Sequence, residues 1–258
     1  MTRVVTNVSR SADIADRKYK HRQPVKMSSD GYELYYWSGQ YVGPGRGEFV
    51  RLLFIEAGVP FKDISEGIME MFKQADQKWT GYPALAVPLL KKGNFELSQT
   101  PVICRYLGKQ FGLFPDNEED QWHAEQINVT VHDYIAEGRL AFHGINHFAS
   151  YFGQEKETQP YIDRFLAERL PKFMKHFEKI LAANDGGNRY VVGGKVTYAD
   201  LGLLHVLRAT AAQFPEAWAA VDYAPLVKAF KDRMEARPNL AAYFKSDKCL
   251  PFSGNSMM

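Results

Sequence analysis

The stretch Ala84–Gly112, ALAVPLLKKGNFELSQTPVICRYLGKQFG, decides the fold that the sequence predicts. Its apolar run Val87–Leu90 predicts a short strand, the turn Lys91–Asn94 follows, and Phe95–Leu97 predicts a second strand that completes a hairpin. Pro88 lies within the first strand, at a position where a cis peptide could hold a backbone N–H and C=O out towards a ligand. The hairpin therefore has a backbone edge that is suited to binding.

A helix is predicted directly after the hairpin. Thr100 stands where an N-cap belongs, and Pro101 takes the first helical position, where its missing N–H costs nothing. The apolar residues that follow at helical spacing are Val102, Ile103, Tyr106 and Leu107. The start of such a helix has free N–H groups and the positive end of a dipole, which suit a carboxylate or phosphate. An ordinary hairpin and capped helix would show the same pattern, so both interpretations stay open at this point.

Length and composition narrow the class of protein. A chain of 258 residues is long enough for two domains with sizeable cores. The net charge of +2 favours neither a nucleic-acid partner nor a membrane surface, and no apolar run is long enough to cross a membrane. Cys104 and Cys249 have no metal-ligand spacing and fit a reducing compartment, with Cys104 expected in the core.

Residues 1–30 differ from the rest of the chain. They are basic and poor in apolar residues, which predicts a disordered N-terminal extension. The basic, serine-containing start also fits a weak organelle-targeting segment, although Asp13 and Asp16 argue against that function.

Residues 31–113 read as alternating strands and helices. Tyr32–Trp37 predicts an aromatic strand, a glycine-rich loop follows, Glu48–Ala57 predicts a helix, and Phe61–Ile64 predicts another strand. Together with the hairpin, this order predicts a small mixed sheet covered by helices. The glycines do not form the GxGxxG pattern of a dinucleotide site.

Residues 119–258 read as helices throughout. Long amphipathic segments cover 119–151 and 159–184, and a kink is expected in the second at Pro171. Shorter helices are predicted at 223–236 and 239–245.

A capping box lies in this helical part. Thr197 is its N-cap and Asp200 takes the place of the usual Glu or Gln three residues later. Val196 and Leu201 are placed as a hydrophobic staple, so Ala199–Ala212 is predicted to be a buried central helix.

Six motifs, taken in their order along the chain, resemble those of the cytosolic glutathione S-transferases over about Tyr32–Phe252. The motifs are Tyr36-Trp37, Gly45-Arg46-Gly47-Glu48, Val87-Pro88, Ser98-Gln99-Thr100, the capping box, and Arg237-Pro238-Asn239-Leu240-Ala241-Ala242-Tyr243. The resemblance implies a thioredoxin-like N-terminal domain with a mixed four-stranded sheet and an all-α C-terminal domain. The Gln-Thr pair is closest to the tyrosine-type classes (alpha, mu, pi and sigma).

Three features depart from those classes. The loop Ser38–Pro44 is longer than usual, Thr100 replaces a Ser, and Ala86 replaces a Gln or Asn.

The resemblance implies a catalytic role for Tyr36. Its O–H would donate to the sulfur of glutathione and stabilise the thiolate, which is the nucleophile; a thiol with a pKa of about 8.5 is mostly protonated at neutral pH. Arg46 would add positive charge, Val87 would pair with the cysteinyl backbone, and Gln99 and Thr100 would hold the γ-glutamyl carboxylate. The residues that the resemblance places around glutathione are Trp37, Arg46, Lys78, Trp79, Val87, Pro88, Gln99, Thr100 and Asp133.

Alternatives accompany these assignments. Tyr35 alternates with Tyr36 and is expected in the core, with the reverse register as the alternative. Ser38 is a second candidate for thiol activation. His143 and His147 have the spacing of metal ligands but no third ligand nearby in sequence, so no metal is expected. Arg51, like Arg105, is expected to serve a structural ion pair or the surface.

The predicted function is conjugation of glutathione, as co-substrate, to small hydrophobic electrophiles in the cytoplasm. A ligand-binding protein of the same fold is the alternative from another class, and glutathione-dependent isomerase or peroxidase activity is a variant of the first. The resemblance also implies a homodimer, in which Asp133 or Glu137 reaches the γ-glutamyl amine of the other subunit. For neither acid does the sequence offer an obvious partner in its own chain.

Overall fold

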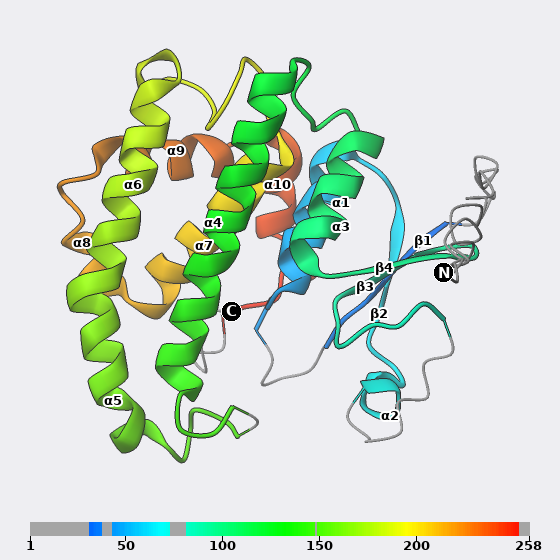
Figure 1. The fold of residues 1–258 in the computed structure, drawn as a ribbon, viewed down its shortest axis with the longest axis horizontal. Helices are drawn as coiled ribbons and strands as arrows, with labels where there is room; N and C mark the ends of the chain where they lie inside the picture. The colour runs from blue at the N-terminus through cyan, green and yellow to red at the C-terminus, as the bar shows by residue number, and fades with distance from the viewer. Residues whose placement is uncertain (1–30, 38–42, 73–80, 148, 253–258) are drawn as a thin grey trace, which may run out of the picture.

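The computed structural model describes residues 31–37, 43–72, 81–147 and 149–252 (Figure 1). A four-stranded sheet with its helices forms one part, here called the sheet region, and a bundle of helices forms the other, here called the helical region. In Figure 1, α1 and α3 lie on the side of the sheet that faces the helical region. The predicted fold class, a mixed sheet followed by helices, is confirmed.

The sheet has the order β2-β1-β3-β4. β1 pairs in parallel with β2 and antiparallel with β3, which pairs antiparallel with β4. The elements of this region are β1 (Tyr32–Tyr35), α1 (Gly47–Ala57), β2 (Phe61–Ile64), α2 (Ile68–Phe72), β3 (Leu89–Lys92), β4 (Phe95–Ser98) and α3 (Thr100–Gln110).

The predicted hairpin is present, with shifted boundaries. β3 begins at Leu89 and runs through Lys92, so the turn is confined to Gly93 and Asn94. Gly93 has a φ of 57°, the left-handed conformation that glycine adopts without a steric penalty. The Val87–Pro88 peptide is cis, as its sequence position allowed.

The N-cap prediction at Thr100 is wrong by one residue. Thr100 is the first residue of α3, and Gln99 is the N-cap, with a φ of 71° and a ψ of 106°. The reason is that β4 continues through Ser98, so the whole change of direction between strand and helix falls on Gln99.

β1 is shorter than the predicted strand Tyr32–Trp37. Its ladder with β3 ends at Tyr35, and the Tyr36 N–H makes one more bond to the Ile64 carbonyl, at 3.0 Å. Tyr36 therefore stands at the end of the strand, where its side chain leaves the sheet.

The expectation that Tyr35 points into the core is wrong. Leu34 and Tyr36 share the buried face of β1, whereas Tyr35 lies half-buried on the other face and donates to the Glu33 carboxylate at 2.9 Å. Because side chains alternate along a strand, the burial of Tyr36 decides the register.

In the helical region, α7 lies in the middle and contacts α4, α8 and α9 (Figure 1). The elements of this region are α4 (Glu118–His143), α5 (Glu155–Arg164), η1 (Phe165–Arg169), α6 (Leu170–Ala183), η2 (Asp185–Gly187), α7 (Tyr198–Gln213), α8 (Pro215–Ala219), α9 (Pro225–Glu235) and α10 (Pro238–Phe244). No helix among the described residues is both long and apolar enough to span a membrane.

Two long segments end differently from the sequence prediction. The segment 119–151 is helical only as far as His143, and 159–184 is covered by α5, which begins at Glu155, and by α6, which begins at Leu170. The turn η1 joins them with π-helical bonds and ends at Arg169, two residues before Pro171, whose missing N–H removes one donor from the normal ladder.

α7 begins with the predicted capping box. Asp200 accepts the Thr197 N–H and the Val191 N–H, each at 2.8 Å, and the Thr197 hydroxyl at 2.7 Å. Both side chains of the box are fully buried. The helix that follows is buried over most of its length, which confirms the predicted central helix.

Thr197→Ala is expected to lower stability without affecting glutathione binding. Loss of a cap costs about 1 kcal/mol, which lowers Tm by roughly 2–4 °C in a chain of this size. Calorimetry and the KM for glutathione test this. Thr130→Ala, at a partly exposed helical threonine whose hydroxyl donates to the Gln126 carbonyl at 2.8 Å, is the matched control and should melt like the wild type. Native melting with a raised KM would contradict the assignment.

α1 is the element that joins the two regions. Its residues 47–54 are all buried, as in a helix packed on every side, and it contacts α3, α7 and α10. Tyr243 of α10 donates to Glu48 at 3.1 Å, near the start of α1. Near its end, Arg237 pairs with Glu56, and the Asn239 amide donates to the Glu56 carbonyl at 2.9 Å.

Candidate active site

The strand register places three predicted site residues in one row. β1 and β3 last pair at Tyr35 and Leu89, and Leu89 pairs with Ser98 of β4. The next residues in line are Tyr36, Pro88 and Gln99. They lie at the same end of the sheet, at the ends of three adjacent strands that are about 4.8 Å apart.

The Tyr36 side chain is enclosed by the loop that leads into α1. Its hydroxyl oxygen accepts the Arg46 N–H at 2.7 Å. Gly45 and Gly47 lie so close that a Cβ on either would come within 2.6 Å of a ring atom of Tyr36. Glycine is thus required at positions 45 and 47 because this loop wraps the tyrosine ring.

Positive charge surrounds the Tyr36 hydroxyl. Burial raises the pKa of the phenol above its ordinary value, against the lowering effect of the Arg46 N–H and of the Arg46, Arg51 and Arg139 charges. The phenol is therefore protonated at neutral pH and has a proton to donate. No acceptor for that proton is found among the described residues.

Arg51 packs against the ring of Tyr36. It is buried, with its guanidinium 5.7 Å from the centre of the Tyr36 ring. It pairs with Asp63 of β2 and with Glu48, the latter at 3.5 Å, and donates to the Pro44 carbonyl at 2.9 Å. The prediction of a structural ion pair at Arg51 is confirmed, and the same residue holds the loop around Tyr36.

Two buried histidines of the helical region approach this loop, and sequence reasoning missed both. His205 of α7 bonds the Gly45 carbonyl through Nε2, at 3.0 Å. His132 of α4 bonds the Asn128 carbonyl through Nδ1, at 2.8 Å, and stacks on Phe49 at 4.5 Å. The sequence did contain a signal for His205, because a histidine within the apolar run of the central helix is expected to be buried.

Arg139 of α4 was missed as well. Its pKa is lowered by burial, and its charge acts on Tyr36 and Arg46. It donates to the His147 carbonyl at 2.9 Å. Nothing in its spacing distinguishes it from a surface cation, because only the packing of α4 on the sheet region brings it near Tyr36.

Backbone groups complete the site. Val87 lies beyond the β1–β3 ladder, and its N–H and C=O have no backbone partner in the part of the chain that the structure describes. In the first turn of α3, the N–H groups of Val102 and Ile103 both donate to the Gln99 carbonyl at 3.0 Å. Since Pro101 has no N–H, the donor of this turn that has no acceptor among the described residues is the Thr100 N–H.

The remaining predicted residues have different positions. Trp37 is half-buried against the core, next to Tyr36. Asp133 is exposed on α4. Glu137 has a partner in its own chain, contrary to expectation, because Arg169 binds it through two bonds of 2.5 and 2.6 Å. Lys78, Trp79 and Ser38 lie outside the described residues.

His143 and Cys104, two residues that the sequence singled out, have structural surroundings in the described part of the chain. Within the described ranges, no three His, Cys, Asp or Glu side chains are grouped as metal ligands, and His143 bonds the Ala149 carbonyl at 3.0 Å. Burial raises the pKa of the Cys104 thiol, which lies in the core as predicted.

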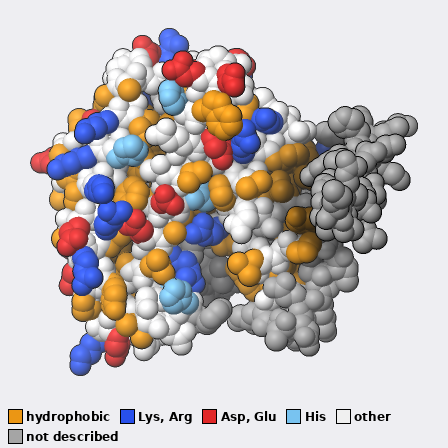
Figure 2. Space-filling view, viewed as in Figure 1, with side chains coloured by type: hydrophobic (Ala, Val, Ile, Leu, Met, Phe, Trp, Pro, Cys, Tyr) orange, Lys and Arg blue, Asp and Glu red, His pale blue; other side chains and the backbone are white. Residues whose placement is uncertain are grey.

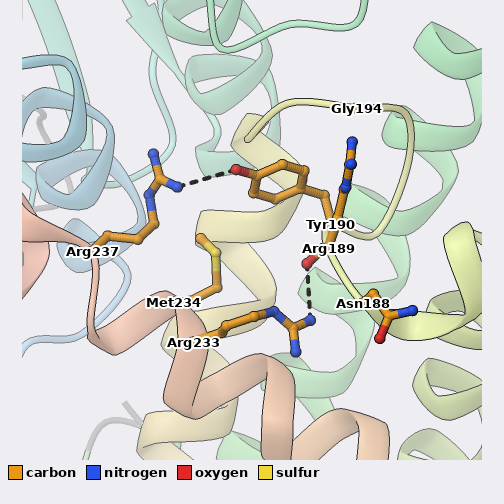
Figure 3. A pocket seen from close by; sticks show the side chains of 7 residues that line it. All are labelled: Asn188, Arg189, Tyr190, Gly194, Arg233, Met234 and Arg237. Atoms are coloured by element: carbon orange, nitrogen blue, oxygen red, sulfur yellow. Dashed lines mark hydrogen bonds between the residues drawn. The ribbon is translucent and has the colours of Figure 1, made fainter.

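An open pocket of about 270 Å³ lies elsewhere, beside the end of α9 (Figure 3). Arg189, Arg233 and Arg237 line it. Each of the three already has a partner: Arg189 pairs with Asp185, Arg237 with Glu56, and Arg233 donates to two backbone carbonyls at 2.9 and 3.0 Å. As Figure 3 shows, Arg237 also points at the Tyr190 hydroxyl. These arginines tie the 187–194 loop to α9 and α10.

A mixed four-stranded sheet of thioredoxin type, an all-helical second region and a buried tyrosine at the end of the first strand define the fold of the glutathione S-transferases. Comparisons agree with this class. A family model described as "Glutathione S-transferase, C-terminal domain" matches residues 142–247. "Glutathione S-transferase P 1" of Xenopus laevis is 33% identical over 84% of this chain and 93% of its own.

Solved structures show the same fold. The Pi-class glutathione S-transferase of Onchocerca volvulus is 24% identical, with a TM-score of 0.65 over 83% of this chain and 91% of its own. The monomeric Na-GST-3 of Necator americanus is 24% identical, with a TM-score of 0.67 over 84% and 97%. The chain belongs to the glutathione S-transferase family.

Proposed function

We propose that this protein is a glutathione transferase that binds glutathione along the row Tyr36, Pro88 and Gln99 and activates its thiol with Tyr36. The row spans two strand spacings, roughly 10 Å, which is also the length of an extended tripeptide. One observation carries the proposal: the buried Tyr36 hydroxyl accepts the Arg46 N–H and keeps its own proton for another acceptor.

The chemistry follows from that hydroxyl. A donor that meets the sulfur stabilises the thiolate more than the thiol, and each pKa unit of lowering corresponds to about 1.4 kcal/mol. The charges of Arg46 and Arg139 act in the same direction. The thiolate attacks the electrophilic carbon, a carbon–sulfur bond forms, and the leaving group departs with its electron pair, while the thiol proton passes to solvent.

The γ-glutamyl end of glutathione would lie at the start of α3. Val87 offers an N–H and a C=O to the cysteinyl backbone. The γ-glutamyl carboxylate would meet the Thr100 N–H and the positive end of the α3 dipole. The Gln99 conformation supports this placement, because a non-glycine residue at a φ of 71° is strained, and such residues cluster at ligand sites.

A conjugation assay tests the proposal. We expect a chloro-nitrobenzene acceptor to be converted only when glutathione is present, with a thioether product and released chloride. Firm glutathione binding without turnover would instead identify a ligand-binding protein of the same fold. Glutathione-dependent isomerisation and peroxide reduction, measured in parallel, would show whether either reaction exceeds conjugation.

A homodimer is part of the proposal, and exposed apolar side chains support it. Leu85 is 79% exposed before β3, and Trp122 is 60% exposed on α4. Val129 and Asp133 follow Trp122 at helical spacing on the same face of α4. Figure 2 shows hydrophobic side chains among the charged ones over α3 and α4. A partner on this face would bring Asp133 into the interface.

Light scattering at micromolar concentration is expected to give twice the chain mass. Leu85→Glu should give the monomer mass, because a buried unpaired charge is costly at an interface. Tyr161→Glu, at an apolar side chain of α5 that is 43% exposed, is the matched control and should remain dimeric. A wild-type monomer would refute the dimer and the role of Asp133 together.

We also propose that residues 31–113 and 119–258 are separate domains and that residues 1–30 are an extension. A cytoplasmic location completes the proposal. The family and the two cysteines, both free thiols, support a reducing compartment.

A further inference from the structure

We propose that His205, in the helical region, is a positioning residue for the Tyr36 hydroxyl, acting through the single peptide unit that joins Gly45 to Arg46. His205 Nε2 and the Gly45 carbonyl oxygen are 3.0 Å apart, and the Arg46 N–H donates to Tyr36 at 2.7 Å. The inference rests on the proposed role of Tyr36.

The direction of each hydrogen bond is fixed. A carbonyl can only accept, so His205 Nε2 carries the proton. Its Nδ1 is buried and has no partner among the described residues, as in the neutral ring. Burial lowers the pKa of His205 to about 3, which keeps this form at any pH used in an assay.

The imidazole ring is held rigidly. Phe49 of α1 meets it edge-on at 4.6 Å, and Phe252 stacks on it at 6.2 Å. His205 is fully buried, so water does not replace its bond to Gly45. A donor fixed in this way sets the orientation of the peptide plane.

The peptide plane transmits the effect to the tyrosine. A donor on a carbonyl polarises the amide and strengthens the N–H at its other end. That N–H occupies one lone pair of the Tyr36 oxygen. The phenol O–H is thereby left to donate to the glutathione sulfur. Without His205, the one donor that the described residues leave to the Gly45 carbonyl is the Glu48 N–H, at 3.2 Å.

Three variants test the inference through the titration of bound glutathione thiolate, followed by its ultraviolet absorbance. His205→Leu removes the donor. His205→Asn has a side chain that is too short for its amide to reach the Gly45 carbonyl. Both should raise the pH at which thiolate forms and lower kcat at pH 6.5 by about fivefold, the effect of one neutral hydrogen bond. The KM for glutathione should change little. His205→Gln, whose amide reaches as far as Nε2, should restore the wild-type titration.

A double variant separates this inference from the proposed function. In a Tyr36→Phe background, His205→Leu should have no further effect on the titration, because the group that it positions is absent. A wild-type titration in His205→Leu or His205→Asn, or no rescue by His205→Gln, would refute the role of His205 while Tyr36 still stands. A wild-type titration in Tyr36→Phe itself would refute the proposed function.

Discussion

Tyr36→Phe is expected to lower turnover on the order of 10²-fold, since it removes one hydrogen-bond donor to a developing anion and keeps the aromatic ring. Glutathione should still bind through Val87, Gln99 and Thr100. The bound thiol should then titrate nearer to its free pKa of about 8.5, so the rate-against-pH curve should move to higher pH.

Tyr35→Phe is the matched control for this experiment. Tyr35 is adjacent in sequence, but its hydroxyl bonds Glu33 on the opposite face of the sheet. The control should keep both the turnover and the thiolate titration of the wild type. If the Tyr35 variant or Ser38→Ala lost the thiolate while Tyr36→Phe kept it, the site would be assigned to the wrong residue.

Gly45→Ala is expected to reduce turnover to a similar degree by displacing the same hydroxyl. Gly45 has a φ of 59°, and a Cβ there would lie within 2.6 Å of Tyr36 Cε1 and closer still to the hydroxyl. The loop or the ring must move by about 1 Å, and a displacement of that size at a reacting group can cost 10²-fold. Combined with Tyr36→Phe, the second change should add little, because both act on one group.

Gly58→Ala separates displacement from backbone strain. Gly58 ends α1 with a φ of 65°, but a Cβ there meets no atom within 4 Å. Both substitutions carry the left-handed penalty of about 1–2 kcal/mol, whereas only the one at Gly45 moves Tyr36. Equal turnover in the two variants, measured with saturating glutathione, would contradict the proposed packing of the loop on the tyrosine.

Local patterns predicted the fold well. The capping box, the hairpin and the order of strands and helices depend on neighbouring residues, so a sequence shows them directly. Boundaries shifted where two elements compete for the same residue, as at Thr100, where β4 extends to Ser98 and leaves Gln99 as the N-cap.

The site was harder to predict because its contacts are distant in sequence. The motifs pointed to Tyr36 and Arg46, and the structure brings the two together. His205 and Gly45 are 160 residues apart, and no periodicity links them. The pairing of Glu137 with Arg169 is another such contact, 32 residues apart, which the expectation of an unpaired acid overlooked.

The burial of α1 on all sides limits how one region of this chain could be exchanged for that of a relative. The groups proposed to contact glutathione through Tyr36, Val87 and Gln99 all belong to the sheet region, yet α1 would expose Phe49 and the buried Glu48 if that region stood alone. Exchange of the helical region for another would have to preserve a donor for Gly45 and partners for both ends of the helix. The two halves of this chain are therefore expected to be exchangeable only as a matched pair, because both pack on α1.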